Sequence, residues 1–363
     1  MRRRAIAAAL CALVTVEAHA QKADAKLYVT NQGGASVSVI DQTRLSVDTV
    51  IDLIALGFTP NAKPHHAIVE RDGSYWYITL IGDGRVLKFD RANRLVAQVK
   101  METPGLLALD PVHDSLYVGR SMTAVNPPRS LGVIKRSSFA MIEEQEIQIA
   151  RPHALAITPD GKWVHVASLA ENRFASLEIA TGRVTLTTLP GPVMRSMVQF
   201  TVSPDGKRMI VGGELSNTVL VFDLAKSAPF VPLAEFALAG KPWDPVFSRN
   251  GTRAWFSLFA DNAVAEVELN TGRIVRTLRG HMAQPYDMIM RADGKYLFVV
   301  NQNIGGVKAG QSAHDNMAGM AGMAASSGPA KGWLSVIDLR TGKAVKELML
   351  GVSPSGMGAA GAR

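Results

Sequence analysis

Residues 152–168 read PHALAITPDGKWVHVAS, and the recurrence of this pattern along the chain predicts the fold. It contains a proline, a short apolar strand, a Pro-Asp-Gly turn and a second strand rich in aromatic and β-branched residues. The same phrase opens again at Pro64 and at Pro285. The turn glycines recur at intervals of 88, 45, 45 and 43 residues, at Gly73, Gly161, Gly206, Gly251 and Gly294. The first interval is two repeats with a degenerate turn at His113-Asp114, so the period is about 44 residues, which predicts a ring of small sheets.

Each repeat supplies four short strands. In the copy that opens at Pro152 we expect them at residues 154–157, 163–168, 174–179 and 184–188. Alternation of polar and apolar residues within the strands indicates half-buried sheet faces, and the turns contain the glycines that tight hairpins need. A Thr-Gly-Arg or Thr-Gly-Lys turn follows the third strand at residues 181–183, 271–273 and 341–343.

Seven segments have the pattern of a second strand: residues 27–31, 75–80, 116–119, 163–168, 209–212, 254–258 and 296–301. The first of them has no first strand before it, whereas Ser353-Pro354-Ser355-Gly356-Met357 repeats the opening phrase at the other end of the chain. We therefore expect an all-β fold, a seven-bladed β-propeller of four-stranded antiparallel blades. N- and C-terminal strands that share one blade would close the ring and remove free sheet edges.

The segment Leu27-Tyr28-Val29-Thr30-Asn31, followed by Val37-Ser38-Val39-Ile40-Asp41, resembles the repeat of the YVTN β-propeller family. The resemblance covers essentially the whole chain after residue 20. It implies the propeller fold and leaves the activity open, because related propellers include surface-layer proteins, lactonases and the haem-carrying propellers of periplasmic nitrite reductases.

The first twenty residues have the pattern of a secretory signal peptide. Arg2-Arg3-Arg4 precedes an apolar run over residues 5–16, and Ala18-His19-Ala20 has the small-residue pattern of a cleavage site. The run is too short for a permanent membrane span. We therefore expect residues 1–20 to be removed and residues 21–363 to form a single propeller domain, periplasmic and without a membrane span. The only cysteine, Cys11, lies in the signal peptide, so the mature protein has no thiolate site.

The charge of the chain is modest and dispersed. It has 39 basic and 31 acidic residues, a net charge of +8. The signal peptide contains three arginines and one glutamate, so its removal leaves +6. There is no basic stripe and no nucleic-acid module, so the sequence argues against nucleic-acid binding. We expect a monomer.

Propeller topology places the start of each first strand at one mouth of the central channel. Seven residues directly follow a repeat proline or occupy the equivalent position. In chain order they are His65, Gly105, His153, Val198, Trp243, Tyr286 and Ser355. The next residue is His66, Leu106, Ala154, Gln199, Asp244, Asp287 or Gly356. Because side chains alternate along a strand, we expect only one of His65 and His66 to face the channel.

Imidazole and carboxylate groups that converge in a concave site suit a divalent metal or an anionic cofactor. The mouth therefore predicts metal ligands at His65, His66, His153, Asp244 and Asp287, and cofactor contacts at Trp243, Tyr286 and Arg195. The alternative is a water-filled channel that is simply lined by polar residues.

An insertion at about residues 302–331 interrupts one blade, between a second and a third strand. It contains one histidine and three methionines at a spacing of three, at His314, Met317, Met320 and Met323. Thioether sulfur is a soft ligand that favours Cu(I), so the segment predicts a copper contact at the same mouth. The alternative is a low-complexity segment without a binding role. Met122, in another long loop, could reach this face, although a single methionine ordinarily packs.

No nucleophile motif is present, so we expect a binding or accessory protein that supports a periplasmic redox protein, with copper as the leading ion. A lactonase-like hydrolase is one alternative, with His66 or His153 as base and Arg195 as the group that holds a carboxylate or oxyanion. A haem or tetrapyrrole carrier is another, implied by the nitrite-reductase resemblance. It would use His65, His66 or His153 as axial ligand, with Arg195 or Arg120 at the propionates.

Overall fold

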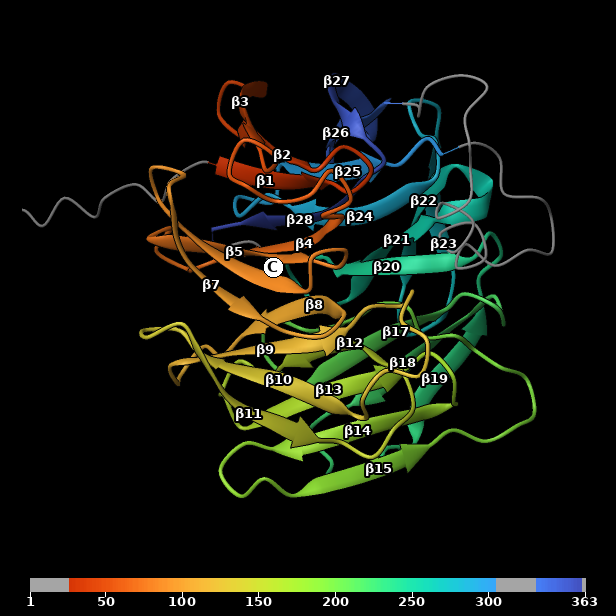
Figure 1. Cartoon of the computed structure of the whole chain (residues 1–363). Helices are drawn as coiled ribbons and strands as arrows, with labels where there is room; N and C mark the ends of the chain where they lie inside the picture. Colours follow the sequence, from red (N-terminus) through yellow and green to blue (C-terminus); the bar gives the residue numbers. More distant parts are fainter. Residues whose placement is uncertain (1–25, 305–330, 361–363) are drawn as a thin grey trace, which may run out of the picture.

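A computed structural model describes residues 26–304 and 331–360. These residues form seven four-stranded antiparallel sheets arranged in a ring (Figure 1). The predicted seven-bladed β-propeller is therefore confirmed. Apart from the strands, the described residues contain one short 3-10 helix, η1 (Phe259–Asp261). No helix in the described ranges is long and apolar enough to cross a membrane.

We number the blades 1 to 7 along the chain and list their strands from the channel outward. Blade 1 has β28 (Pro354–Ala359), β1 (Lys26–Asn31), β2 (Ser36–Asp41) and β3 (Ser46–Asp52); blade 2 has β4 (Pro64–Val69), β5 (Tyr75–Leu80), β6 (Arg85–Asp90) and β7 (Leu95–Lys100). Blade 3 has β8 (Pro104–Leu109), β9 (Ser115–Arg120), β10 (Ser130–Lys135) and β11 (Ala140–Glu146); blade 4 has β12 (Pro152–Ile157), β13 (Trp163–Ser168), β14 (Arg173–Glu178) and β15 (Val184–Thr188).

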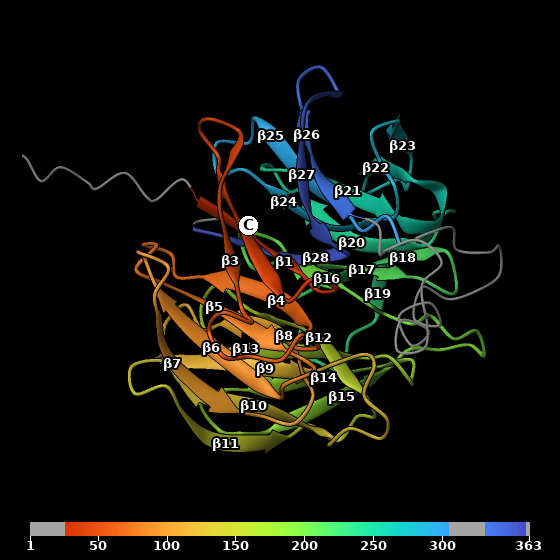
Figure 2. The same cartoon turned by 45° about the horizontal axis from the view of Figure 1, so that its top comes forward.

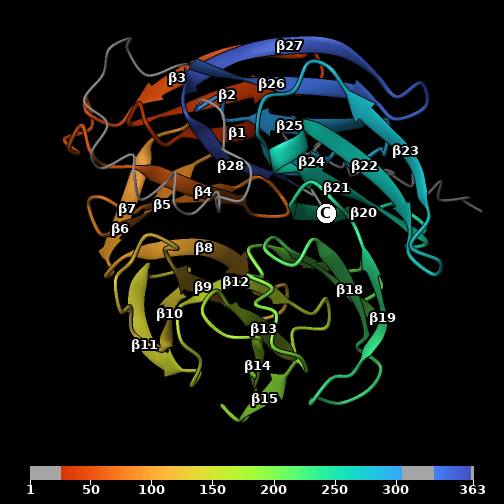
Figure 3. The same cartoon turned by 90° about the vertical axis from the view of Figure 1, so that its right-hand side faces the viewer.

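Blade 5 has β16 (Phe200–Val202), β17 (Arg208–Gly213), β18 (Thr218–Asp223) and β19 (Pro232–Ala237); blade 6 has β20 (Pro242–Phe247), β21 (Arg253–Leu258), β22 (Ala263–Glu268) and β23 (Ile274–Arg279). Blade 7 has β24 (Pro285–Met290), β25 (Tyr296–Asn301), β26 (Lys331–Asp338) and β27 (Lys343–Val352). In Figure 3 the first strands lie toward the centre of the ring and the fourth strands lie at its rim.

The two ends of the chain close the ring, as the sequence predicts. Strand β28 pairs antiparallel with β1, with Leu27 opposite Ala359 and Val29 opposite Met357. The red β1 and the blue β28 lie side by side in Figure 2. Pairing the two ends in one sheet leaves no unpaired edge at the seam of the ring.

The core lies between the blades. Trp76 of blade 2 stacks between Tyr28 of blade 1, at 4.2 Å between ring centroids, and Phe89 of its own blade, at 4.1 Å. Phe174 of blade 4 meets Phe222 of blade 5 edge to face at 5.5 Å. Such aromatic contacts fix neighbouring blades to one another, because they bury large apolar areas that a single sheet cannot cover.

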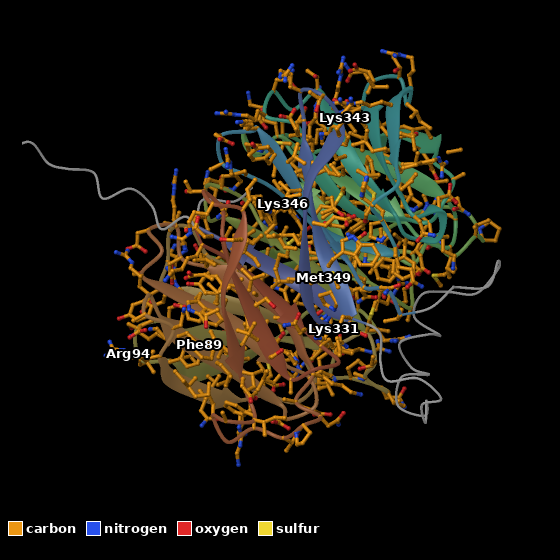
Figure 4. All side chains as sticks on the ribbon, turned by 90° about the horizontal axis from the view of Figure 1, so that it is seen from above. Phe89, Arg94, Lys331, Lys343, Lys346 and Met349 are labelled. Carbon is orange, nitrogen blue, oxygen red and sulfur yellow. The ribbon has the colours of Figure 1, made fainter. Side chains whose placement is uncertain are left out.

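The outer strands carry the polar surface. Strand β27 is the longest, and Figure 4 shows Lys343, Lys346 and Met349 along it. The Met349 side chain is 61% exposed, whereas Leu348 and Leu350 of the same strand are buried in a cluster with Leu27 and Val29 of blade 1.

A β-bulge follows the repeat proline in six of the seven first strands, all except β16. In blade 2, Pro64 pairs with Leu80 and Ala67 pairs with Ile78, so three steps on β4 oppose two on β5. The extra residue breaks the alternation that an ideal strand would have. The expectation that only one of His65 and His66 can face the channel is therefore not imposed by the backbone.

Candidate functional site

Two histidines from non-adjacent blades meet at the mouth of the channel. His65 follows the repeat proline in β4, and His153 follows it in β12. Their ring centroids lie 6.1 Å apart. Blade 3 stands between them and carries Gly105 at the same position, where an added Cβ would lie 2.5 Å from the carbonyl oxygen of Arg120. Only glycine fits at this position, because a Cβ would collide with the backbone of Arg120 and Ser121 in the same blade.

The hydrogen bonds of these two rings differ. Nδ1 of His153 lies 2.9 Å from the Arg120 carbonyl oxygen, which can only accept, so Nδ1 carries a proton and the lone pair of the neutral ring is on Nε2. The His65 side chain is 1% exposed, and neither of its ring nitrogens has a hydrogen-bond partner within residues 26–304 and 331–360. A buried polar group without a partner costs free energy, and such exceptions call for an explanation.

Both of these imidazoles are buried. Burial lowers the pKa of His65 well below its usual value, and the nearby His153 and His66 rings lower it further. At neutral pH the His65 ring is therefore uncharged and keeps a lone pair. A neutral imidazole is the form that binds a metal ion.

His66 has a different role. Its Nδ1 accepts a hydrogen bond from the backbone N–H of Leu107 in blade 3, at 3.2 Å. Burial, together with a smaller electrostatic effect of His153, lowers the pKa of His66 to about 4, so this ring is also neutral near pH 7. Its Nδ1 lone pair is used within the protein.

Asp244 and Asp287 make the same kind of contact between other blades. The N–H of Met288 donates to Oδ2 of Asp244 at 2.6 Å, and the N–H of Met357 donates to Oδ2 of Asp287 at 2.6 Å. In each case the acceptor is the second residue after a repeat proline, and the donor is the third residue after the proline of the next blade. We call this contact, including His66 with Leu107, the blade latch.

The two carboxyl groups also interact with each other. Burial raises the pKa of Asp244 well above its usual value, and the negative charge of Asp287 raises it further. Burial raises the pKa of Asp287 to about 7. We infer that the pair holds one proton at neutral pH, because two buried charges this close repel each other.

An apolar cluster occupies part of the mouth. The mouth cluster consists of Met122, Leu169, Val198, Trp243, Phe259 and Tyr286, which come from five blades. The Trp243 ring lies 5.1 Å from Phe259 and 5.2 Å from Tyr286, and the Tyr286 hydroxyl lies 3.9 Å from Sδ of Met122. Trp243 and Tyr286 are thus packed in this cluster, and Met122 does reach the mouth, where it packs. A site for a tetrapyrrole would need these side chains to move.

The two arginines that the tetrapyrrole and lactonase alternatives need are engaged within their blades. Arg195 binds the carboxylate of Glu235 at 3.1 Å and the carbonyl oxygen of Pro190 at 3.0 Å. Arg120 donates to the carbonyl oxygen of Ser130 and to Glu144. Cofactor binding by Arg195, Trp243 and Tyr286 stays a prediction.

The predicted metal ligands are only partly brought together. Within the described ranges, no three His, Cys, Asp or Glu side chains gather closely enough to hold a metal ion. His65 and His153 form a pair, whereas His66, Asp244 and Asp287 make blade latches. The signal peptide and the Met-rich positions His314, Met317, Met320 and Met323 lie outside the described residues.

The sequence analysis missed a set of hydroxyl groups on the second strands. Thr30 Oγ1 accepts the N–H of Gly356 in its own blade and donates to the carbonyl oxygen of His65 in the next, both at 3.0 Å. Thr79 bonds in the same way to His66 and to Gly105. The available signal was the threonine of Tyr28-Val29-Thr30-Asn31, a polar residue in an otherwise apolar strand.

Comparison with known proteins supports the fold and does not identify a family or an activity. No protein-family model matches the chain, and no curated protein matches it. Among solved structures it is similar to a functionally unknown protein from Desulfotomaculum acetoxidans, at 14% identity and a TM-score of 0.70, over 92% of this chain and 98% of that one. The likeness shows a shared fold alone.

Two further solved structures share the fold. The dihydro-heme d1 dehydrogenase NirN, in complex with DHE, is 16% identical with a TM-score of 0.63, over 93% of this chain and 76% of that one. A streptogramin B lyase is 15% identical with a TM-score of 0.63, over 76% and 87%. At these identities the matches show the propeller fold alone, and membership of the YVTN family stays a prediction.

Proposed function

We propose that this chain is an exported binding protein that holds one metal ion between His65 and His153, with copper as the ion. The observation that carries the proposal is the buried imidazole pair, in which His65 has no hydrogen-bond partner among the described residues. Two imidazoles that share one ion through bonds of about 2 Å have ring centroids about 6 Å apart. The observed separation of 6.1 Å fits this arrangement.

The surroundings of His153 support the same role. Metal-ligating histidines usually donate their second ring N–H to a carbonyl or carboxylate, which fixes the tautomer. The bond from His153 to the Arg120 carbonyl oxygen is of this kind. Copper rather than zinc is favoured by the sequence alone, because the thioethers of Met317, Met320 and Met323 are soft ligands. In this proposal the protein serves a periplasmic redox protein.

A Cu(I) titration against a chromophoric chelator, on protein purified without its signal peptide, tests the site. We expect one ion per wild-type chain and at least a tenfold loss of affinity in His65→Ala and in His153→Ala. His113→Gln, which changes an exposed histidine, is the matched control. Unchanged affinity in both alanine variants would overturn the histidine site. Unchanged affinity in a variant with Met317, Met320 and Met323 all replaced by Leu would show that the insertion does not contribute to the metal site.

The tetrapyrrole alternative is tested on the same samples. The solved NirN structure in complex with DHE has this fold, so haem binding to this chain is worth measuring. The mouth cluster argues against it, because Trp243 and Tyr286 are packed in part of the mouth and would have to move. A Soret band on addition of haem, lost in His65→Ala and in His153→Ala, would replace the copper proposal with a tetrapyrrole carrier.

A further inference from the structure

A second candidate site lies between blades 4 and 5, far from the repeat prolines. A cavity of about 160 Å³ is lined by Trp163, His165 and Ser176 of blade 4 and by residues of the loop 224–230 of blade 5. Trp163 opens a second strand and the loop follows a third strand, so the cavity lies toward the face opposite the channel mouth.

The loop is a departure from the repeat. Most blades connect their third and fourth strands by a short turn, such as Thr181-Gly182-Arg183, whereas blade 5 has eight residues between β18 and β19. The N–H of Phe230 donates to Oγ1 of Thr187 in blade 4 at 2.9 Å. The Phe230 ring meets the His165 ring edge to face at 5.4 Å. This loop therefore reaches across the blade boundary and forms one wall of the cavity.

His165 is also a departure from the repeat. It is the third residue of its second strand, where the other blades carry Tyr28, Tyr77, Tyr117, Ile210, Trp255 and Phe298. The residue opposite His165 in β14 is Ser176. Blades 2 and 6 also carry a polar residue in this third-strand position, and both are partnered: Lys88 donates to the Arg136 carbonyl oxygen, and Glu266 pairs with Arg276, each at 2.7 Å. In blade 4 the polar pair faces a cavity instead.

The hydrogen bond between His165 and Ser176 fixes the tautomer of the ring. Nδ1 lies 3.0 Å from Oγ of Ser176. The serine hydroxyl proton has no other acceptor in the part of the chain that the structure describes, so it is donated to Nδ1. Burial lowers the pKa of His165 to about 4, so the ring is neutral near pH 7 and carries its proton on Nε2. Nε2 itself has no partner among the described residues, which leaves an N–H donor on a ring that lines the cavity.

We infer that this cavity binds a small organic anion, a monocarboxylate with an apolar body. The Nε2–H of His165 would donate to the carboxylate, and Lys226 on the loop would supply positive charge at the rim. Trp163 and Phe230 form apolar walls. A cavity of about 160 Å³ suits a compact ligand with one ring better than a nucleotide or a peptide.

Nearby carboxylates do not oppose an anion at this position. Asp160 is paired with Lys162 at 3.4 Å and accepts from Thr158, and Asp223 caps its own turn by accepting the N–H of Ala225 at 3.0 Å. Each negative charge thus has a local donor, and Thr158, which donates to Asp160, is itself one of the residues that line the cavity.

Calorimetric titration with benzoate, with neutral benzamide as the matched compound, tests the inference. We expect benzoate to bind at least tenfold more tightly than benzamide. His165→Phe restores the kind of residue that blade 7 has in Phe298 and removes the donor, so it should abolish binding. Lys226→Gln should weaken binding about two- to fivefold, as an exposed charge does. Lys295→Gln is the control lysine and should change nothing.

Two further measurements keep the result clear. Ser176→Ala leaves the cavity in place and releases the tautomer, so it should weaken benzoate binding even if His165→Phe fails to fold. His65→Ala should leave benzoate affinity unchanged, which separates this site from the proposed metal site. Absence of benzoate binding to the wild type up to about 10 mM, or equal binding by a folded His165→Phe variant, would overturn the inference.

Discussion

Oδ2 of Asp244 accepts the backbone N–H of Met288 at 2.6 Å, across the boundary between blades 6 and 7. Asp287 makes the same contact with Met357 of β28. Each first strand is the inner edge strand of its sheet, so some of its N–H groups have no partner in the ladder, and a buried N–H needs one. The blade latch supplies that partner from the neighbouring blade. Residues that look like metal ligands in the sequence thus hold the ring together.

The carboxyl pair should make stability depend on pH in a defined direction. Burial raises the pKa of Asp287 to about 7, above its unfolded value of 3.8. The ionised form is therefore penalised in the folded state. This penalty is fully present above about pH 7, shrinks as the pH falls and is absent below 3.8. Asp287→Asn keeps an acceptor for Met357 and removes the charge. We expect its melting temperature to exceed that of the wild type at pH 8 and to converge with it near pH 4.

The size of this effect is bounded by the shift. One pKa unit corresponds to about 1.4 kcal/mol, so the gain at pH 8 should not exceed about 4 kcal/mol. Thermal melts of both proteins at several pH values measure it, and the histidines titrate alike in both, so their contribution cancels in the difference. Asp48→Asn on the exposed strand β3 is the control. A difference that stays constant from pH 8 to pH 4 would contradict this account.

The latch of His66 predicts a second effect. His66→Leu would leave the Leu107 N–H without an acceptor, which costs about 1–3 kcal/mol of folding free energy, whereas His66→Gln retains an acceptor. The pKa of His66 falls to about 4 on folding, from 6.5. The unfolded chain therefore takes up the proton first, and the stability is present above pH 6.5 and lost as the pH falls toward 4.

Urea unfolding of the three proteins at pH 7.5 and at pH 5 measures this. We expect the wild type to lose stability between the two pH values by more than His66→Gln does. If His66→Leu and His66→Gln unfold at the same urea concentration at pH 7.5, the hydrogen bond to Leu107 contributes nothing and the latch is only a geometric coincidence.

The fold could be predicted because it depends on a pattern that recurs seven times. The turn glycines, the repeat prolines and the repeated pattern at Ser353-Pro354 all indicate the same four-stranded unit. A copy that matches the pattern poorly can therefore be recognised by comparison with the others. The bulges could not be predicted in this way. They lie where neighbouring blades approach closely, as at Gly356, where an added Cβ would lie 2.4 Å from the carbonyl oxygen of His65. A single strand read alone shows only alternation.

The position of the site could be predicted from the sequence, but which of its side chains contact one another could not. The sequence places His65, His153, Asp244 and Asp287 at the mouth, and the structure divides them into an imidazole pair and a carboxyl pair. This division depends on which blades the four residues come from. The cavity at His165 has a sequence signal, a histidine where the other blades have apolar residues, and only comparison between blades makes it visible.

The hydroxyl group of Thr30 should contribute more to the folding free energy than the volume of the side chain does. Thr30→Val keeps the shape and removes the bonds to His65 and to Gly356 at the closure of the ring. The buried N–H of Gly356 would lose its acceptor, whereas the His65 carbonyl oxygen still accepts from Oγ of Ser355 at 3.0 Å, so we expect a loss of about 1–3 kcal/mol. Thr49→Val, on the exposed strand β3, should change stability by less than about 0.5 kcal/mol. Equal stabilities of the two variants, from urea unfolding, would show that the closure does not depend on this hydroxyl.

The mouth cluster predicts a packing cost at Met122. The Met122 side chain is 2% exposed and contacts Tyr286 of a distant blade, so Met122→Ala leaves a cavity beside Trp243 and Tyr286. Substitutions of this kind cost about 2–5 kcal/mol in a core that cannot collapse. Met194→Ala, at a side chain that is 37% exposed, is the matched control and should cost much less. The melting temperature measures both. A Met122→Ala variant as stable as Met194→Ala would mean that the long loop of blade 3 does not fasten the mouth, and that Trp243 and Tyr286 can be displaced at little cost to admit a larger ligand.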